Sequence, residues 1–219
     1  MQKPLLIVVA AALAILGSSL GGDAIWLHYV FKPLATILIL LLAWRTAEPV
    51  SADYKRAVVT GLFMSLCGDV SLMLPKSVLG MGFELGLASF LVAHLFLLRA
   101  FTRDAALFSK RLPLIVLLVI SIGNLAVLWP SISPALHIPV LAYMMCLVGM
   151  AAQSISRAMA LGSADSRLAA VGGVFFLISD TTLAYNKFYA SVPASSVLVL
   201  GTYYLALYLI ARSVQRTKT

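Results

Sequence analysis

The sequence is short of charged residues and of long polar segments. Only 11% of its 219 residues are charged, whereas 62% are hydrophobic, and the mean hydropathy is +1.01. Soluble domains carry about 25% charged residues, so this composition excludes an ordinary soluble domain. Because no polar stretch is long enough to form a separate unit, we expect a single integral membrane domain over residues 1–219.

Cysteine and histidine are also scarce. Cys67 and Cys146 both lie inside apolar runs, and the three histidines are far apart in the sequence. The spacing of these residues indicates neither a disulfide nor a metal site, and we expect no cofactor. The formal net charge is +8, but the basic residues are spread over helix ends and form no patch. We therefore expect no nucleic-acid partner.

Apolar runs of roughly 20 residues, each long enough to cross a hydrocarbon core about 30 Å thick, recur along the chain. A segment in lipid must satisfy its own backbone hydrogen bonds, and runs of this length do so as helices. Glycine and proline mark the breaks between the runs. The sequence therefore predicts an all-α membrane protein with eight transmembrane helices, at 4–20, 31–45, 56–74, 80–100, 112–129, 136–157, 168–187 and 194–212.

The distribution of lysine and arginine predicts the orientation of these helices. With the N-terminus inside, the inner segments hold 13 of the 16 basic residues. The outer segments hold only Lys32, Lys76 and Lys187. Cytoplasmic loops carry the excess of positive charge, so we expect both termini in the cytoplasm. The compact loops favour a bacterial inner membrane.

Two segments of the chain repeat one another. GDVSLMLPK at 68–76 and SDTTLAYNK at 179–187 share aspartate, leucine and lysine at the same offsets, 111 residues apart. Four helices separate them, so both predicted helices run in the same direction. This pattern is typical of a parallel duplication, with half-repeats at 1–105 and 106–219. The aspartates of the two copies, Asp69 and Asp180, are predicted to lie in the outer third of the membrane.

An aspartate inside a transmembrane helix requires an explanation, because it costs about 2.5–3.5 kcal/mol on insertion scales. One explanation is structural: each carboxyl group forms a hydrogen bond with a serine or tyrosine on a neighbouring helix. The other is functional, and two carboxyl groups at one depth on related helices favour it. We therefore expect Asp69 and Asp180 to form a catalytic pair.

Further polar side chains in or beside the predicted helices are candidates for binding a substrate. A lone membrane histidine is more often a packing residue, and outer lysines commonly extend to the interface, so structural roles remain open for both types. Lys32 and Pro33 are expected to open the second helix. The candidate substrate-binding residues are Lys32, Glu84, His94, Tyr143, Ser179 and Lys187, with Tyr204 as a further pocket candidate.

At this point the pattern resembles a known family, the YhhN-like lysoplasmalogenases. The likeness covers nearly the whole chain, including its length and eight helices, although Leu97 stands where a family tyrosine is expected. It rests on Lys32-Pro33, Gly68-Asp69, Phe83-x2-Gly86-x3-Phe90-x3-His94, Tyr143 and Gly172-x3-Phe176-x2-Ser179-Asp180-x2-Leu183-Ala184.

The resemblance implies a lysophospholipid substrate within the lipid bilayer. It implies hydrolysis of the vinyl ether bond of lysoplasmalogens, giving a fatty aldehyde and a glycerophospho-ethanolamine or -choline. Vinyl ethers hydrolyse by protonation of an alkene carbon, which gives an oxocarbenium ion that water captures. Two buried carboxyl groups suit this reaction, because one can donate the proton while the other faces the developing cation. Paired carboxyl groups in glycosidases meet a similar transition state.

Two other functions remain open at this stage. A transporter of small solutes or lipids would also suit a parallel repeat with intramembrane acids, although the predicted helices lack matching interruptions at the membrane midplane. The second is a metal-dependent intramembrane hydrolase, in which Asp69, Asp180 and His94 gather around zinc.

Overall fold

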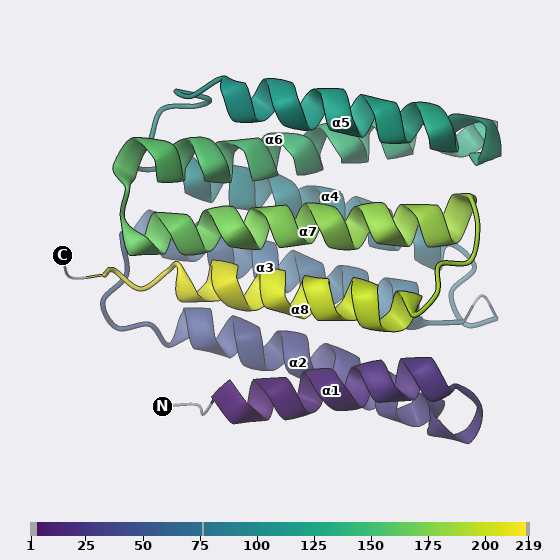
Figure 1. The fold of residues 1–219 in the computed structure, drawn as a ribbon. Helices are drawn as coiled ribbons and strands as arrows, with labels where there is room; N and C mark the ends of the chain where they lie inside the picture. Colours follow the sequence, from purple (N-terminus) through teal and green to yellow (C-terminus); the bar gives the residue numbers. More distant parts are fainter. Residues whose placement is uncertain (1–3, 76, 218–219) are drawn as a thin grey trace.

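The computed structural model describes residues 4–75 and 77–217, and its described part is all-helical (Figure 1). Eight α-helices run roughly parallel or antiparallel to one another, and three short 3₁₀ turns lie in the connections. The α-helices are α1 (Pro4–Leu20), α2 (Ile25–Trp44), α3 (Ala52–Met73), α4 (Gly82–Phe101), α5 (Leu112–Leu128), α6 (His137–Leu161), α7 (Ala164–Phe188) and α8 (Ser195–Arg212).

Seven of these helices, α2 to α8, are long and apolar enough to cross a membrane. Helix α1 is also apolar but has only 17 residues; α5 has the same length, but the 3₁₀ turn Trp129–Ser131 extends its apolar span to 20 residues. It packs against α2 and α8. Its Gly17 allows a close approach, because a Cβ there would lie 2.5 Å from the backbone nitrogen of His28.

The prediction that Lys32 and Pro33 open the second helix is wrong. Helix α2 begins at Ile25, after the 3₁₀ turn Gly22–Ala24, and the positive φ angles of Gly21 and Gly22 allow the chain to turn there. Pro33 therefore lies inside the helix. Proline removes one backbone donor, but a transmembrane helix tolerates it where neighbouring helices satisfy the freed group. As a consequence, Lys32 is carried into the bundle, where it is 7% exposed.

The helices of the first half and those of the second half have matching neighbours. Helix α1 contacts α2 as α5 contacts α6, and α3 contacts α4 as α7 contacts α8. Contacts between the halves match as well, since α2 packs on α8 and α6 packs on α4. The match is incomplete, because α1 also packs on α8, whereas α5 and α4 do not pack closely on one another among the described residues.

Close packing on the aspartate-bearing helices depends on two glycines, each eight residues before the aspartate. A Cβ at Gly61 would lie 3.0 Å from the Leu97 side chain and 3.2 Å from the Ala93 carbonyl oxygen. A Cβ at Gly172 would lie 2.8 Å from the Ile210 side chain and 3.0 Å from the Ala206 carbonyl oxygen. Each glycine therefore sets the distance to the next helix of its own half.

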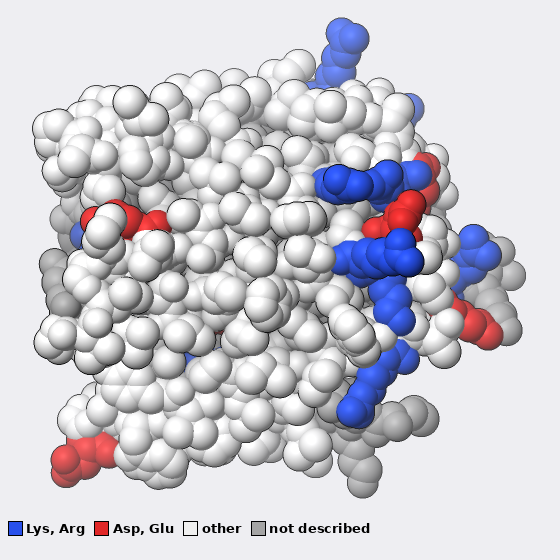
Figure 2. Space-filling view, turned by 180° about the vertical axis from the view of Figure 1, so that it is seen from behind, with Lys and Arg blue, Asp and Glu red and all other residues white. Residues whose placement is uncertain are grey.

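The two ends of the bundle differ in charge. Both termini emerge at the same end (Figure 1), and Figure 2 shows the Lys and Arg side chains gathered toward that end. The connections between α2 and α3, between α4 and α5, and between α6 and α7 also lie there. We refer to it as the basic end and to the opposite end as the far end.

One buried charge cluster holds the basic end together. The Arg157 side chain is fully buried and donates two hydrogen bonds of 2.7 Å to the carboxylate of Asp104 and one of 2.9 Å to Asp165. Its guanidinium carbon also lies 4.7 Å from the centre of the Tyr54 ring. The cluster joins α3, α6, α7 and the connection between α4 and α5.

Candidate active site

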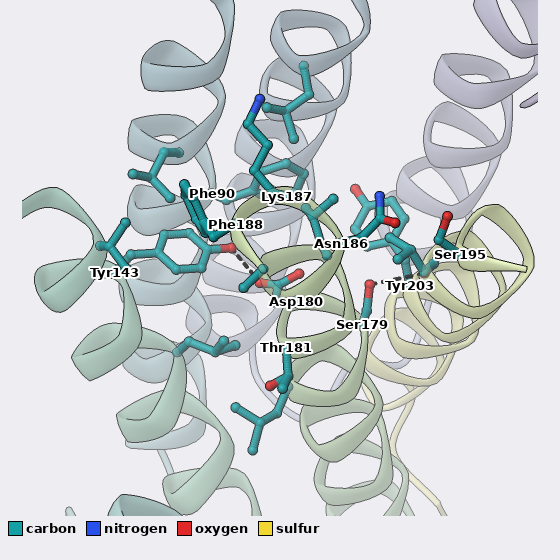
Figure 3. Close-up of a pocket in the computed structure, with 18 of the residues that line it drawn as sticks. Phe90, Tyr143, Ser179, Asp180, Thr181, Asn186, Lys187, Phe188, Ser195 and Tyr203 are labelled. Carbon is teal, nitrogen blue, oxygen red and sulfur yellow. Dashed lines mark hydrogen bonds between the residues drawn. The ribbon is translucent and has the colours of Figure 1, made fainter. Parts of the chain in front are cut away.

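A cavity of about 400 Å³ opens among the helices, and all eight contribute residues to its lining. Its volume falls in the range of roughly 300–1,000 Å³ that is typical of small-molecule pockets. The lining is mostly apolar, and both Asp69 and Asp180 belong to it. Figure 3 shows part of this lining, with Tyr143, Asp180 and Ser179 around one turn of α7. The two aspartates of the sequence repeat therefore share one cavity.

The Asp69 side chain projects from α3 and contacts three polar side chains. The Thr36 hydroxyl donates a hydrogen bond of 2.7 Å to Oδ2, and the Tyr203 hydroxyl donates one of 2.8 Å to the same oxygen. The Lys32 ammonium nitrogen lies 3.6 Å from Oδ1. The carboxylate side chain is 2% exposed. Oδ2 thus accepts two hydrogen bonds from hydroxyl groups, while Oδ1 faces a cation.

Asp180 projects from α7 and has different partners. The Tyr143 hydroxyl donates a hydrogen bond to its Oδ2, drawn as a dashed line in Figure 3. The Nε2 atom of His94 lies 3.9 Å from the same oxygen, beyond hydrogen-bond distance. The Asp180 side chain is 11% exposed, so it is more accessible from the cavity than that of Asp69.

An aromatic cluster lies beside both carboxyl groups. The rings of Phe90, Phe176 and Tyr203 contact one another edge to face, with centroids 5.6–6.3 Å apart. Phe176 also lies 4.7 Å from the ring centre of His94. Such T-shaped contacts are favourable because the positive edge of one ring meets the negative face of another. The cluster connects Tyr203, which binds Asp69, with His94, which lies beside Asp180.

Most of the candidate residues that the sequence suggested line this cavity. Those present in the lining are Lys32, Asp69, Tyr143, Ser179, Asp180 and Lys187. The Ser179 hydroxyl donates a hydrogen bond of 3.0 Å to the Val199 carbonyl oxygen, so it also links α7 to α8. The Lys187 ammonium group lies 4.9 Å from the centre of the Phe83 ring.

The remaining candidates lie elsewhere. Glu84 is exposed near the start of α4 and does not belong to the cavity lining. His94 lies behind the lining, fully buried against Tyr143 and Phe176. The Tyr204 hydroxyl is buried and has no hydrogen-bond partner among the described residues, and Tyr204 does not line the cavity. Lys76 lies outside the described residues.

Two partners of Asp69 were missed at the sequence level. Thr36 is a neutral residue in an apolar run, and only its position four residues after Lys32, on the same helix face, connects it to the site. Tyr203 and Tyr204 are adjacent in the sequence, so composition alone does not show which of the two faces inward.

The described residues offer no cluster that could hold a metal ion. No group of three or more His, Cys, Asp or Glu side chains is close enough together for this purpose in residues 4–75 and 77–217. Asp180 and His94 are near one another, but Asp69 has its own partners. The geometry therefore gives no support to a zinc site formed by these three residues.

Comparison with known proteins reveals several relatives. The sequence profile of the YhhN family matches residues 27–214. The human protein named lysoplasmalogenase TMEM86A is 31% identical over 194 residues, covering 86% of this chain and 78% of the human protein. A lysoplasmalogenase of Mycobacterium bovis is 32% identical over 199 residues, covering 89% of this chain and 72% of that protein.

A third relative comes from Escherichia coli. The uncharacterized membrane protein YhhN is 29% identical over 193 residues, covering 86% of this chain and 87% of that protein. No solved structure matches this chain.

Proposed function

The chain belongs to the YhhN family, and we propose on that premise that it is a membrane-embedded lysoplasmalogenase. It hydrolyses the vinyl ether bond of a lysoplasmalogen to a fatty aldehyde and a glycerophospho-ethanolamine or -choline. The names of the human and mycobacterial relatives support this activity. The observation that carries the mechanism is that Asp69 and Asp180 line the same cavity.

In this mechanism Asp180 is the proton donor. No lysine or arginine among the described residues forms an ion pair with it, and its side chain is the more accessible of the two acids. The carboxyl proton passes to the alkene carbon that is not bonded to oxygen, where a new C–H bond forms. The electron pair of the ether oxygen then generates an oxocarbenium ion at the other alkene carbon. The carboxylate left on Asp180 faces this cation.

Water completes the reaction. It adds to the oxocarbenium carbon, and its proton returns to the Asp180 carboxylate, which leaves a hemiacetal. The hemiacetal C–O bond to glycerol then breaks, and the glycerol oxygen takes up the hydroxyl proton as the aldehyde forms. One water molecule is consumed, and the acid is regenerated.

Asp69 supplies a second carboxylate in this scheme. It accepts hydrogen bonds from Thr36 and Tyr203 and pairs with Lys32, and such partners interact best with an ionised carboxylate. A fixed anion in a cavity from which water is largely excluded stabilises a cationic transition state without reorganising. Lys32 balances this charge in the resting protein and carries a positive charge that suits the phosphate of the substrate.

We also propose that the basic end faces the cytoplasm of a bacterial inner membrane. The gathering of Lys and Arg at that end (Figure 2) supports this orientation. Asp69 lies four residues and Asp180 eight residues from the far ends of their helices, or about 6 and 12 Å at 1.5 Å per residue. A lysolipid in the outer leaflet would place the first atoms of its chain near this depth.

We further propose that the halves 1–105 and 106–219 arose by parallel duplication. The matching helix contacts and the equivalent positions of Gly61 and Gly172 support it. Each aspartate also takes partners from both halves. Asp69 is bound from α2 and α8, whereas Asp180 is approached from α6 and α4.

The proposed activity is tested with purified protein and three matched lysolipids that carry a vinyl ether, a saturated ether or an ester. We expect aldehyde from the vinyl ether alone. Asp69→Asn and Asp180→Asn should each abolish turnover, whereas Asp53→Asn should not, because Asp53 is exposed and pairs only with Arg56 at 3.7 Å among the described residues. Full activity in both cavity variants would refute the mechanism. Lipid or solute flux in proteoliposomes without chemical turnover would instead favour a transporter.

A further inference from the structure

The lining of the cavity has one side rich in polar groups and another side on which apolar side chains predominate. The polar side is formed by α1, α2 and α8 and contains Ser18, His28, Lys32 and Ser196. The opposite side is formed by α5, α6 and α7. We call its apolar residues Leu125, Leu128, Val140, Met144, Leu147 and Leu177 the apolar lobe. The same helices also contribute polar lining residues, among them Asn124, Asn186 and Lys187.

The two acids follow the same division. Asp69 lies toward the polar side, because Lys32 is one of its partners. Asp180 borders the apolar lobe, because Tyr143 precedes Met144 in α6 and Leu177 lies three residues before Asp180 in α7. A molecule with one polar and one apolar end therefore has a single favourable orientation in this cavity.

Helix α5 forms the outer wall of the apolar lobe. It lies at the edge of the bundle beside α6 (Figure 1) and has a narrower contact with α7. Ser121 and Leu128 are 8% and 5% exposed and face the cavity, whereas Val119 and Ile122 on the same helix are exposed. The Tyr185 hydroxyl donates a hydrogen bond of 2.9 Å to Asn124 across the seam between α7 and α5.

The lobe is shallow relative to a long lipid chain. Ser121, Leu147 and Leu177 are the lining residues of α5, α6 and α7 that lie nearest the basic end. Leu177 is only three residues beyond Asp180, which is about 4.5 Å along the helix. A chain that starts at Asp180 thus fills the lobe with its first carbons, and the remainder continues beside α5 toward the bilayer.

We propose that the apolar lobe binds the first carbons of the lysolipid's hydrocarbon chain while the polar side faces the phosphate. This inference rests on the proposed function for the identity of the lipid, and it adds the orientation and the residues that select the chain. A chain that moves from lipid into the lobe exchanges one apolar environment for another. Selection therefore depends on fit to Met144 and its neighbours rather than on hydrophobic transfer.

Two adjacent methionines of α6 provide a matched test. Met144 lines the lobe, whereas Met145 is 50% exposed on the outside of the bundle. Met144→Trp fills the lobe, so kcat/KM for a hexadecenyl vinyl ether lysolipid should fall about tenfold or more relative to that for the ethenyl compound, whose chain ends at the alkene and does not enter the lobe, because small misplacements of a reacting bond are costly. Met145→Trp should leave this ratio at its wild-type value. Substrates are presented in mixed micelles at one surface mole fraction.

A binding measurement separates the chain site from the chemistry. Saturated hexadecyl and ethyl ether lysolipids bind without being cleaved, and Met144→Trp should weaken binding of the hexadecyl compound selectively, because the ethyl chain does not enter the lobe. If the wild-type protein binds with this selectivity but releases no aldehyde, the proposed function fails and the chain site stands. If it releases aldehyde and Met144→Trp affects both chain lengths equally, the chain site is refuted and the proposed function stands.

A second variant covers the case in which Met144→Trp does not fold. Met144→Ala adds no atoms, so it cannot overpack the core. It removes contacts with the chain and should weaken binding of the hexadecyl ether several-fold while leaving the ethyl ether unchanged. Unchanged binding of both compounds would refute the assignment of the lobe.

Discussion

The Nε2 atom of His94 lies 3.9 Å from Oδ2 of Asp180, and neither ring nitrogen of His94 has a hydrogen-bond partner among the described residues. The ring is fully buried and packs edge to face on Tyr143 and Phe176. Buried polar atoms without partners are rare in folded proteins. A shift of about 1 Å would bring this histidine within hydrogen-bond distance of the proposed proton donor. We therefore expect His94 to act as a positioning residue for Asp180.

The variant His94→Phe separates this role from packing. Phenylalanine keeps a ring against Phe176 and removes two unpartnered polar atoms, whose burial costs about 1–3 kcal/mol. We expect the melting temperature in detergent to stay constant or rise, while kcat falls about tenfold or more with little change in KM. A large loss of stability with unchanged kcat would show that the histidine is structural.

Because Lys32 and Asp69 form a buried pair, we expect replacement of Asp69 alone to destabilise the protein more than replacement of both residues. Asp69→Asn leaves the buried Lys32 ammonium group, 9% exposed, without its counter-charge. Loss of one partner of a buried pair typically costs about 3–5 kcal/mol, so we expect a clear fall in thermal stability. Lys32→Met combined with Asp69→Asn should recover most of it. Thermal unfolding checks this cycle, and additive losses would contradict a direct pairing.

The close contact between Gly68 and the Phe90 ring predicts that a larger residue at position 68 would disturb the aromatic cluster. A Cβ at this residue would lie 2.5 Å from the Phe90 ring, so Gly68→Ala must displace the ring toward the cavity. Overpacking of this kind costs about 1–3 kcal/mol, and turnover should fall as well. Gly68→Ala with Phe90→Leu should restore stability.

Gly201 provides the control for this substitution, because nothing lies within 4 Å of its added Cβ. Gly201→Ala should stabilise α8 by up to about 1 kcal/mol through helix propensity alone. A similar loss of stability at both glycines would exclude the proposed clash.

Among substitutions outside the cavity, we expect one at Arg157 to reduce the free energy of unfolding most. Arg157→Met leaves Asp104 and the buried Asp165 without their partner and removes the contact with the Tyr54 ring. We expect a loss of about 3–5 kcal/mol in the free energy of unfolding. Arg167→Met, at an exposed position of α7, should change it by less than about 0.5 kcal/mol. Equal melting temperatures for the two variants would contradict the prediction.

Carboxylates in apolar runs were the strongest signal in the sequence, and the structure places both of them on one cavity. Their energetic cost in lipid makes such residues conspicuous. Their hydroxyl partners carry no comparable signal, since Thr36 and Tyr203 are common residues of membrane helices. Their roles follow from the packing of α2 and α8 on α3, and single-sequence periodicity does not contain that information.

Two interpretations of the sequence, one of Pro33 and one of Arg157, were wrong for the same physical reason. Pro33 suggested a helix start, but α2 continues through it. Arg157 was counted as one of the basic residues at a helix end, yet it is fully buried. In both cases the residue type indicates a local preference that tertiary contacts override. Helix α6 illustrates this well, since it continues to Leu161 and places Arg157 between Asp104 and Asp165.

Helix α5 lies outside the set of helices that hold the two acids and their partners, which are α2, α3, α4, α6, α7 and α8. The outer wall of the proposed chain site is thus encoded apart from the two acids, whereas Val140, Met144, Leu147 and Leu177 share α6 and α7 with Tyr143 and Asp180. Mutations in α5 can retune which lipids are accepted without disturbing the acids. One scaffold could in this way diversify across membranes of different lipid composition.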